Sequence, residues 1–165
     1  MARVRRSIEI AAPPSVVFHY VADHRNALSW MVGFSEFAAV GEQTLGQGAK
    51  VRASGRLVGV PVSTILEIVE FVENDRLVST SDGPVRSRTT WAFAPTAAGT
   101  LVTFSGEYRI HGLPVPAFGE HLLAHEVAAH TTLSLRRLKR VLEARHPDGR
   151  SPRSGDGLET PGERC

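Results

Sequence analysis

The sequence lacks three features that would place it in a familiar class: paired cysteines, a strong net charge and long apolar runs. Its single cysteine, Cys165, excludes an intrachain disulfide and fits a reducing compartment. No segment approaches the roughly 20 consecutive apolar residues of a membrane-spanning helix, and the first residues lack the apolar stretch of a secretory signal peptide. We therefore expect a cytoplasmic protein with no integral membrane association.

The formal net charge is only +2, and the cationic residues gather at two places. Arg3, Arg5 and Arg6 lie near the beginning of the chain, and a second group occupies residues 136–140. Such groups occur in proteins that bind nucleic acids or membrane surfaces. Cations near the carboxyl end of a helix are also favoured by the helix dipole and by solvation. We adopt the second interpretation and predict no nucleic-acid partner.

Length and composition indicate one domain followed by a disordered tail. A chain of 165 residues with 42% hydrophobic residues can bury one core but is short for two domains. After Arg145 the sequence has almost no apolar side chains. Because such a segment cannot bury enough surface to offset its ordering entropy, we predict a domain over residues 1–146 and a disordered tail over residues 147–165.

The hydrophobic pattern predicts a strand, an amphipathic helix, a long series of strands and a closing helix. Pro13 and Pro14 separate the first strand from the first helix, because proline suits the first turn of a helix. A dense apolar patch around Gly33 indicates a second short helix. The predicted strands cover residues 3–11, 36–41, 49–57, 62–71, 76–81, 86–94 and 101–111, and the closing helix covers residues 116–145.

Alternating side chains on two strands indicate a buried face with free volume. In the last predicted strand, Phe104 and Tyr108 share a dry face, as in an antiparallel sheet with solvent behind it. In the third predicted strand, the small Ala53 and Gly55 share a face with Val51. Small residues on an apolar face are expected of a strand that floors a cavity.

The closing helix is also expected to present small residues to the sheet. Counting back from Leu138 in steps of three and four places Thr131, Ala128, Ala124 and His121 on the inward face. A curved sheet against one long helix leaves a hollow wherever the inward side chains are too small to fill it. The pattern therefore predicts a protein that holds an apolar molecule.

Several segments, spread over most of the chain, carry the pattern of a known superfamily: residues 8–23, Trp30, Leu45–Gly48, Trp91–Pro95 and Leu138–Lys139. They resemble the START-like helix-grip (SRPBCC) superfamily, most closely its bacterial polyketide cyclase/dehydrase group. The resemblance implies an α+β helix-grip fold, in which a curved antiparallel β-sheet wraps around a long C-terminal α-helix and two short helices follow the first strand. It also implies a cavity for a hydrophobic ligand between sheet and helix.

Three residues are candidates for proton transfer. The aromatase/cyclases that the chain resembles close a poly-β-ketone chain, which requires acid and base groups in a mostly apolar pocket. Tyr108 would donate to a ligand carbonyl, although a buried tyrosine is also a common core residue. His121 is able to act as an acid or base near neutral pH, although it also fits a structural or surface role. His24, at the end of the first helix, completes the predicted catalytic set.

Apolar and aromatic side chains are expected to form the cavity wall. Trp30 and Trp91 flank the predicted volume, where they fit either the core or a platform for a flat ligand. Tyr20 lies one turn before His24, near the expected mouth. The predicted ligand-binding residues are Tyr20, Trp30, Met31, Phe34, Phe37, Val51, Ala53, Trp91, Phe104, Ala124 and Ala128.

The sequence predicts no cofactor and no metal. His121 and His125 have the i, i+4 spacing of a zinc-binding pair, but the residues between them lack the glutamate of a His-Glu-x-x-His motif. Gly46 and Gly48 indicate a turn, since the longer nucleotide-binding fingerprint is missing.

The predicted cavity is compatible with two functions, and the position of the arginines helps to distinguish them. The first is a polyketide cyclase/aromatase that binds a hydrophobic small molecule, polyketide- or lipid-like, and uses acid/base catalysis. The second is a non-catalytic carrier that sequesters a lipid or apolar metabolite. The related cyclases carry an inward arginine on a strand, whereas strand parity points Arg52 and Arg56 to solvent. A homodimer, or another oligomer through an exposed sheet edge, is left open.

Overall fold

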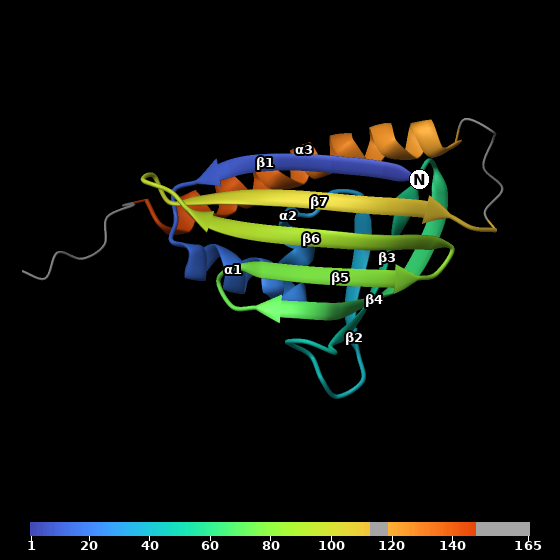
Figure 1. The fold of residues 1–165 in the computed structure, drawn as a ribbon, viewed down its shortest axis with the longest axis horizontal. Coiled ribbons are helices and arrows are strands. Elements are labelled where there is room, and N and C mark those ends of the chain that lie inside the picture. Colours follow the sequence, from blue (N-terminus) through green and yellow to red (C-terminus); the bar gives the residue numbers. More distant parts are fainter. Residues whose placement is uncertain (113–118, 148–165) are drawn as a thin grey trace, which may run out of the picture.

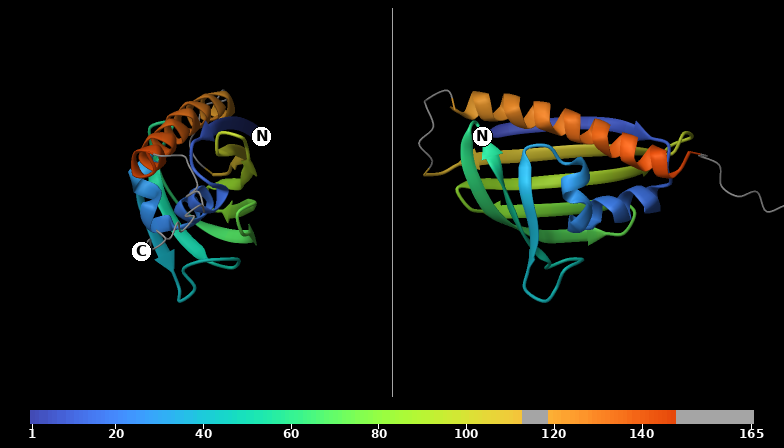
Figure 2. Two further views of the ribbon diagram at one scale, coloured as in Figure 1. Left: turned by 90° about the vertical axis from the view of Figure 1, so that its left-hand side faces the viewer. Right: turned by 180° about the vertical axis from the view of Figure 1, so that it is seen from behind.

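Figure 1 shows a computed structural model of the protein, which describes residues 1–112 and 119–147. One curved sheet forms most of the molecule, and a long helix runs along its open side (Figure 2). The strands are β1 (Ala2–Ile10), β2 (Phe34–Val40), β3 (Lys50–Leu57), β4 (Val60–Val72), β5 (Arg76–Asp82), β6 (Val85–Pro95) and β7 (Thr100–Ile110). The helices are α1 (Pro14–Ala22), the 3-10 turn η1 (His24–Asn26), α2 (Ala27–Trp30) and α3 (Gly119–Arg145).

The sheet is antiparallel throughout, in the order β1-β7-β6-β5-β4-β3-β2. Register shifts interrupt two pairs, between Phe34 and Glu36 of β2 and between Ile68 and Glu70 of β4. Such irregularities bend a strand and increase its twist, which helps to curl the sheet. The α+β helix-grip prediction is therefore confirmed, including the short helices after the first strand.

Helix α1 closes one end of the sheet. Pro14 occupies its first position, where the missing N–H costs nothing and the fixed φ suits a helix. Phe18 is fully buried and packs edge-to-face against Phe71 and Phe93, with ring centroids 5.0 Å and 5.3 Å away. Burial of one such aromatic side chain stabilises the fold by about 1.5–3 kcal/mol.

The face that α3 turns toward the sheet agrees with the prediction from Thr131 to Leu142 and differs from it before Thr131. Its buried residues are Gly119, Leu123, Val127, Thr131, Ser134, Leu135, Leu138 and Leu142. The prediction stepped back from Thr131 to Ala128, whereas the buried face continues to Val127, about 100° away around the helix. Leu123 and Val127 decide the orientation because they bury more apolar area than alanine does. The inward position predicted for His121 is therefore wrong, and this side chain is exposed.

Polar contacts fasten the end of α3 to the end of β1. The Glu143 carboxylate accepts hydrogen bonds from the Ala11 amide at 3.0 Å and from Lys139 Nζ at 2.7 Å. Lys139 also donates to the Glu9 carbonyl at 2.8 Å. The hydrogen bonds from Lys139 and from the Ala11 amide both lower the pKa of Glu143, and the Lys139 hydrogen bond is the larger cause. The helix is thereby held over the sheet at the end opposite the beginning of α3.

The predicted strands all exist, with ends within two residues of those observed. The predicted beginning of the closing helix, near Pro116, lies outside the described residues, as does the predicted tail from residue 148 onward. Within the described ranges, no helix is both long enough and apolar enough to cross a membrane.

Candidate functional site

A cavity of about 230 Å³ lies between the concave face of the sheet and helices α2 and α3. Val51, Ala53 and Gly55 of β3 belong to its wall, which is the small-residue face expected from strand parity. Gly55 is required for a close approach, because a Cβ there would lie 2.2 Å from the carbonyl oxygen of Gly33. Small side chains on β3 therefore leave the volume open and let the segment before β2 pass close to the strand.

Aromatic rings form one side of the cavity. Trp30 of α2 and Trp91 of β6 meet edge-to-face with centroids 5.3 Å apart, and Trp91 lies 4.6 Å from Phe104 of β7. All three side chains are buried. The Trp30 Nε1–H has no hydrogen-bond partner among the described residues. These rings offer a broad apolar surface for a flat or branched ligand.

The cavity meets solvent beside β2 and the loop that follows it. Phe34 and Leu45 line the cavity and yet are 40% and 54% exposed. Phe37 lines it as well, with its ring centroid 4.8 Å from that of Phe34. Residues that are both lining and exposed mark an opening, so we place the mouth at these side chains.

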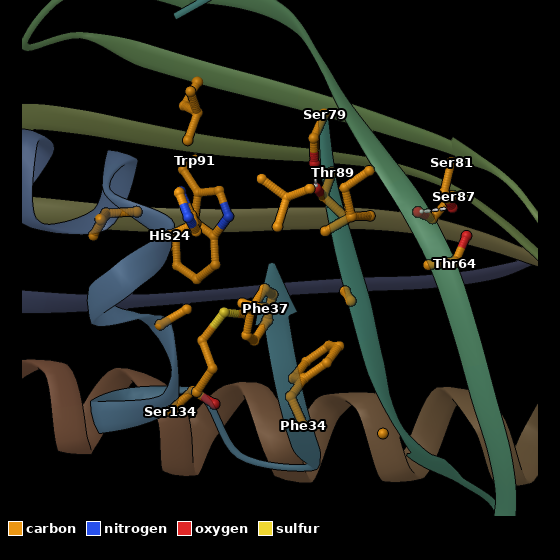
Figure 3. A pocket seen from close by; sticks show the side chains of 18 of the residues that line it. His24, Phe34, Phe37, Thr64, Ser79, Ser81, Ser87, Thr89, Trp91 and Ser134 are labelled. Atoms are coloured by element: carbon orange, nitrogen blue, oxygen red, sulfur yellow. Dashed lines mark hydrogen bonds between the residues drawn. The ribbon is translucent and has the colours of Figure 1, made fainter. Parts of the chain in front are cut away.

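A block of hydroxyl groups forms another part of the wall, on β5 and β6 (Figure 3). Ser79 of β5 faces Thr89 of β6, and their hydroxyl oxygens lie 2.7 Å apart. Ser81 faces Ser87, with 2.8 Å between their oxygens. Buried polar groups are normally hydrogen-bonded, and these pairs follow that rule.

Tyr108 of β7 lies beside this block, directly across from Ser87. Its ring folds along the strand over Gly106, where a Cβ would lie 2.6 Å from Tyr108 Cε2 and 2.8 Å from its hydroxyl oxygen. Burial raises the pKa of the Tyr108 phenol, and no hydrogen bond contributes to the shift. The phenol is therefore protonated throughout the physiological range and is available as a hydrogen-bond donor.

Two histidines line the cavity, His24 of η1 and His130 of α3. His130 Nε2 lies 3.9 Å from Glu126 Oε1, and its ring packs over Gly33, where a Cβ would lie 2.5 Å from Nδ1. Glu126 also accepts a hydrogen bond from the Val58 amide. A carboxylate that is itself held in place thus stands next to a cavity-lining imidazole.

The cavity brings together most of the side chains singled out in the sequence. Those in its lining are His24, Trp30, Met31, Phe34, Phe37, Val51, Ala53, Trp91, Phe104 and Tyr108. The others lie elsewhere. Tyr20 is buried with its hydroxyl 2.7 Å from that of Ser29, Ala124 and Ala128 are partly buried against the core, and His121 is exposed.

Sequence reasoning missed His130 and the hydroxyl block. Serine and threonine at alternate positions of a strand normally indicate a solvent face, so Ser87 and Thr89 attract no attention. Parity with Trp91 was the available signal, since side chains two residues apart share a face of the sheet. For His130 the signal was its position three residues after Val127, on the face that α3 turns inward.

The strand arginines and the possible zinc-binding histidines considered in the sequence lie at the edge of the cavity or outside it. Arg52 and Arg56 are exposed, as parity indicated, and Arg56 borders the cavity while donating to the Gly59 carbonyl at 3.2 Å. Among the described residues, no group of three or more His, Cys, Asp and Glu side chains is placed to hold a metal ion. His121 and His125 are both exposed on α3.

A single antiparallel sheet that encloses an apolar cavity with one long helix defines a START-like helix-grip protein with a site for a hydrophobic ligand. The family described as "polyketide cyclase / dehydrase and lipid transport" matches residues 1–143, and the chain belongs to this family. The resemblance found in the sequence is thereby confirmed. None of the curated proteins compared with the chain matches it.

Solved structures share the fold. TTHA0849 from Thermus thermophilus has a TM-score of 0.74 at 23% identity, over 87% of this chain and 98% of that one. The ZhuI aromatase/cyclase from a Streptomyces species has a TM-score of 0.75 at 15% identity, over 87% and 94%. A START superfamily protein from Mycobacterium smegmatis has a TM-score of 0.71 at 18% identity, over 86% and 99%. Such identities show a shared fold alone.

Proposed function

We propose that the protein binds a hydrophobic small molecule, polyketide- or lipid-like, in the cavity between the sheet and α3. The observation that carries the proposal is the enclosed apolar wall of Trp30, Trp91 and Phe104, which opens to solvent at Phe34 and Leu45. Apolar pockets with a few polar groups are the usual sites for small ligands. The family description, which names polyketide chemistry and lipid transport, supports the same ligand class.

Binding of N-phenyl-1-naphthylamine, which fluoresces in apolar surroundings, tests the proposal. Ala53 is 2% exposed in the cavity wall, so Ala53→Phe should fill the volume and weaken probe binding at least about tenfold. Arg52→Phe is the matched control, because its side chain lies on the outer face of the same strand. Binding that is unchanged in Ala53→Phe, or equally weakened in Arg52→Phe, would place the ligand elsewhere.

We propose, as a second function, acid/base catalysis on the bound molecule, as in a polyketide cyclase/aromatase. The supporting observation is that Tyr108, His24 and His130 all line one cavity. Tyr108 is the proton donor in this proposal, and the imidazole of His24 or His130 is the second acid or base group. His121 has no part in it, because this side chain is exposed and lies outside the cavity lining.

Separate Tyr108→Phe, His24→Gln and His130→Gln variants distinguish the enzyme from a non-catalytic carrier. With a poly-β-ketone substrate, loss of a proton-transfer group lowers turnover by about 100-fold or more. A carrier shows no turnover with the wild-type protein, and its variants change ligand affinity only modestly. Native mass spectrometry of the protein purified from its own host would identify a bound molecule, which is then the ligand to assay.

A further inference from the structure

The hydroxyl block on β5 and β6 is unusual for the inner wall of an apolar cavity. Ser79 and Ser81 line the cavity and are only 8% and 5% exposed. Burying a hydroxyl without full compensation costs about 1–3 kcal/mol. A hydroxyl group of this block can bind a ligand only through a proton or lone pair that no other group of the protein already uses.

One of the two pairs has no proton left to offer. Ser81 donates its only hydroxyl proton to the Val85 carbonyl at 2.9 Å. Ser87 must therefore donate in its 2.8 Å contact with Ser81. Ser87 is left with a free acceptor site and no free donor.

The other pair keeps one proton. Ser79 and Thr89 share a single hydrogen bond of 2.7 Å, and either hydroxyl can be its donor. The hydroxyl that accepts this bond retains its own proton, because each hydroxyl has one. One donor of the Ser79–Thr89 pair is therefore free for a ligand, whichever way the pair is oriented.

Tyr108 adds a second donor beside this pair. Thr89 is the direct cross-strand neighbour of Gly106, and the Tyr108 ring lies over Gly106 because that residue has no side chain. The phenol is thus carried along β7 toward the Ser79–Thr89 pair. Its raised pKa keeps the phenol protonated.

The charge of the lining limits what these donors can bind. Arg56 is the only lysine or arginine of the described lining, and it is exposed and hydrogen-bonded to Gly59. An anionic group at the hydroxyl block would be buried without a lysine or arginine beside it, which is unfavourable. The free donors therefore suit a neutral acceptor.

We infer that Ser79, Thr89 and Tyr108 form a subsite that binds a neutral carbonyl oxygen of the ligand. The inference rests on the proposed binding function and adds an orientation to it. Thr89 and Trp91 are two residues apart on β6, about 6.6 Å along the strand. A ring that lies against Trp91 and Phe104 thus directs a carbonyl substituent to the hydroxyl groups.

A matched pair of ligands tests the subsite. 2-Acetylnaphthalene and 2-isopropenylnaphthalene differ only in the carbonyl oxygen, which is a methylene group in the alkene. Both are titrated as competitors of N-phenyl-1-naphthylamine, and the ratio of the two dissociation constants is compared between proteins. A purely apolar cavity favours the alkene, because the ketone loses its hydrogen bonds to water.

Removal of the donors should shift this ratio toward the alkene. We expect a shift of about fivefold for Tyr108→Phe and a similar shift for the double variant Ser79→Ala/Thr89→Val. The double variant removes both partners of one hydrogen bond, so neither hydroxyl is left unpaired. Thr90→Val is the control, because Thr90 is the next residue on β6 and points to the other face.

The outcomes separate the inference from the proposed function. Binding of both ligands with a ratio unchanged in the variants, or shifted equally in Thr90→Val, overturns the subsite and leaves the cavity as a binding site. Failure of the probe and of both ligands to bind overturns the proposed function and the subsite together. A far-ultraviolet circular dichroism spectrum that matches the wild type shows that a variant is folded, and either donor variant suffices to test the subsite.

Discussion

Tyr108 is the residue whose chemistry depends most on its position. Gly106, two residues earlier on β7, leaves space for the ring of Tyr108. Burial raises the pKa of the phenol, so the phenol keeps its proton. A larger residue at position 106 would push the ring away from the Ser79–Thr89 pair. The role proposed for Tyr108 therefore depends on a neighbour that has no side chain of its own.

The burial of the Tyr108 phenol should make the free energy of unfolding depend on pH in the alkaline range. The unfolded chain releases the phenol proton near pH 10.0, whereas the raised pKa keeps the proton in the folded state. Stability from Tyr108 is therefore complete below pH 10 and declines above it, by up to about 1.4 kcal/mol per pH unit. Urea unfolding at pH 8 and pH 11 should show a loss about 1.4 kcal/mol smaller in Tyr108→Phe than in wild type.

Phe104→Leu is the control for this measurement, because Phe104 lies on the same face of β7 and carries no ionisable group. It should lose as much stability between the two pH values as the wild type does. An alkaline loss in Tyr108→Phe equal to that of the wild type would show that the phenol is not held protonated by the fold.

The contact of α3 with β1 makes a prediction about a whole element. Glu143 joins α3 to the Ala11 amide and to Lys139, but its side chain and that of Lys139 are 32% and 42% exposed. Glu143→Gln should therefore lower the free energy of unfolding at pH 7 by only about 0.5–1 kcal/mol. Since the pKa of Glu143 is lowered, its contribution is present above pH 4.5 and is lost as the pH falls further.

Urea denaturation at pH 7 and pH 3 measures this contribution. The difference between wild type and Glu143→Gln should be smaller at pH 3, because the carboxyl group of the unfolded chain takes up a proton more readily than that of the folded protein. Glu42→Gln, in the exposed segment after β2, should show no difference at either pH. A Glu143→Gln difference that persists at pH 3 would attribute its effect to packing and not to charge.

Elements and faces were predictable from the sequence to different degrees. Strand β7 alternates cleanly, so Phe104 and Tyr108 were correctly placed on the inner face. The first half of the inward face of α3 was missed, because a step of three and a step of four back from Thr131 both reach small or apolar residues. Only the packed structure shows that Val127, and not Ala128, is buried.

The polar part of the cavity was harder to predict for a different physical reason. A serine or threonine on a strand carries the same local signal whether it faces water or a ligand cavity. Parity with Trp91 places Ser87 and Thr89 on the inner face, but their pairing with Ser81 and Ser79 involves another strand. The apolar lining was readable one strand at a time, whereas the hydroxyl block exists only in the assembled sheet.

At the scale of the whole molecule, a filled cavity should stabilise the fold. A ligand that binds only the folded state adds about 2.7 kcal/mol at a concentration of 100 Kd. Saturating N-phenyl-1-naphthylamine should therefore raise the urea midpoint of the wild type and of Arg52→Phe. It should leave the midpoint of Ala53→Phe nearly unchanged, because that variant has no volume for the probe. Equal increases in all three proteins would mean that the probe binds outside the cavity.

The position of the mouth has a kinetic consequence. Phe34 and Leu45 belong to the outermost strand β2 and the loop after it, remote from the α3–β1 contact at the other edge of the sheet. Local openings of a sheet edge require less free energy than global unfolding. A ligand can then exchange while the rest of the sheet stays intact, so its residence time is set by this margin. Residence time and thermal stability are therefore separate properties of this chain, and changes near Leu45 can alter the first without the second.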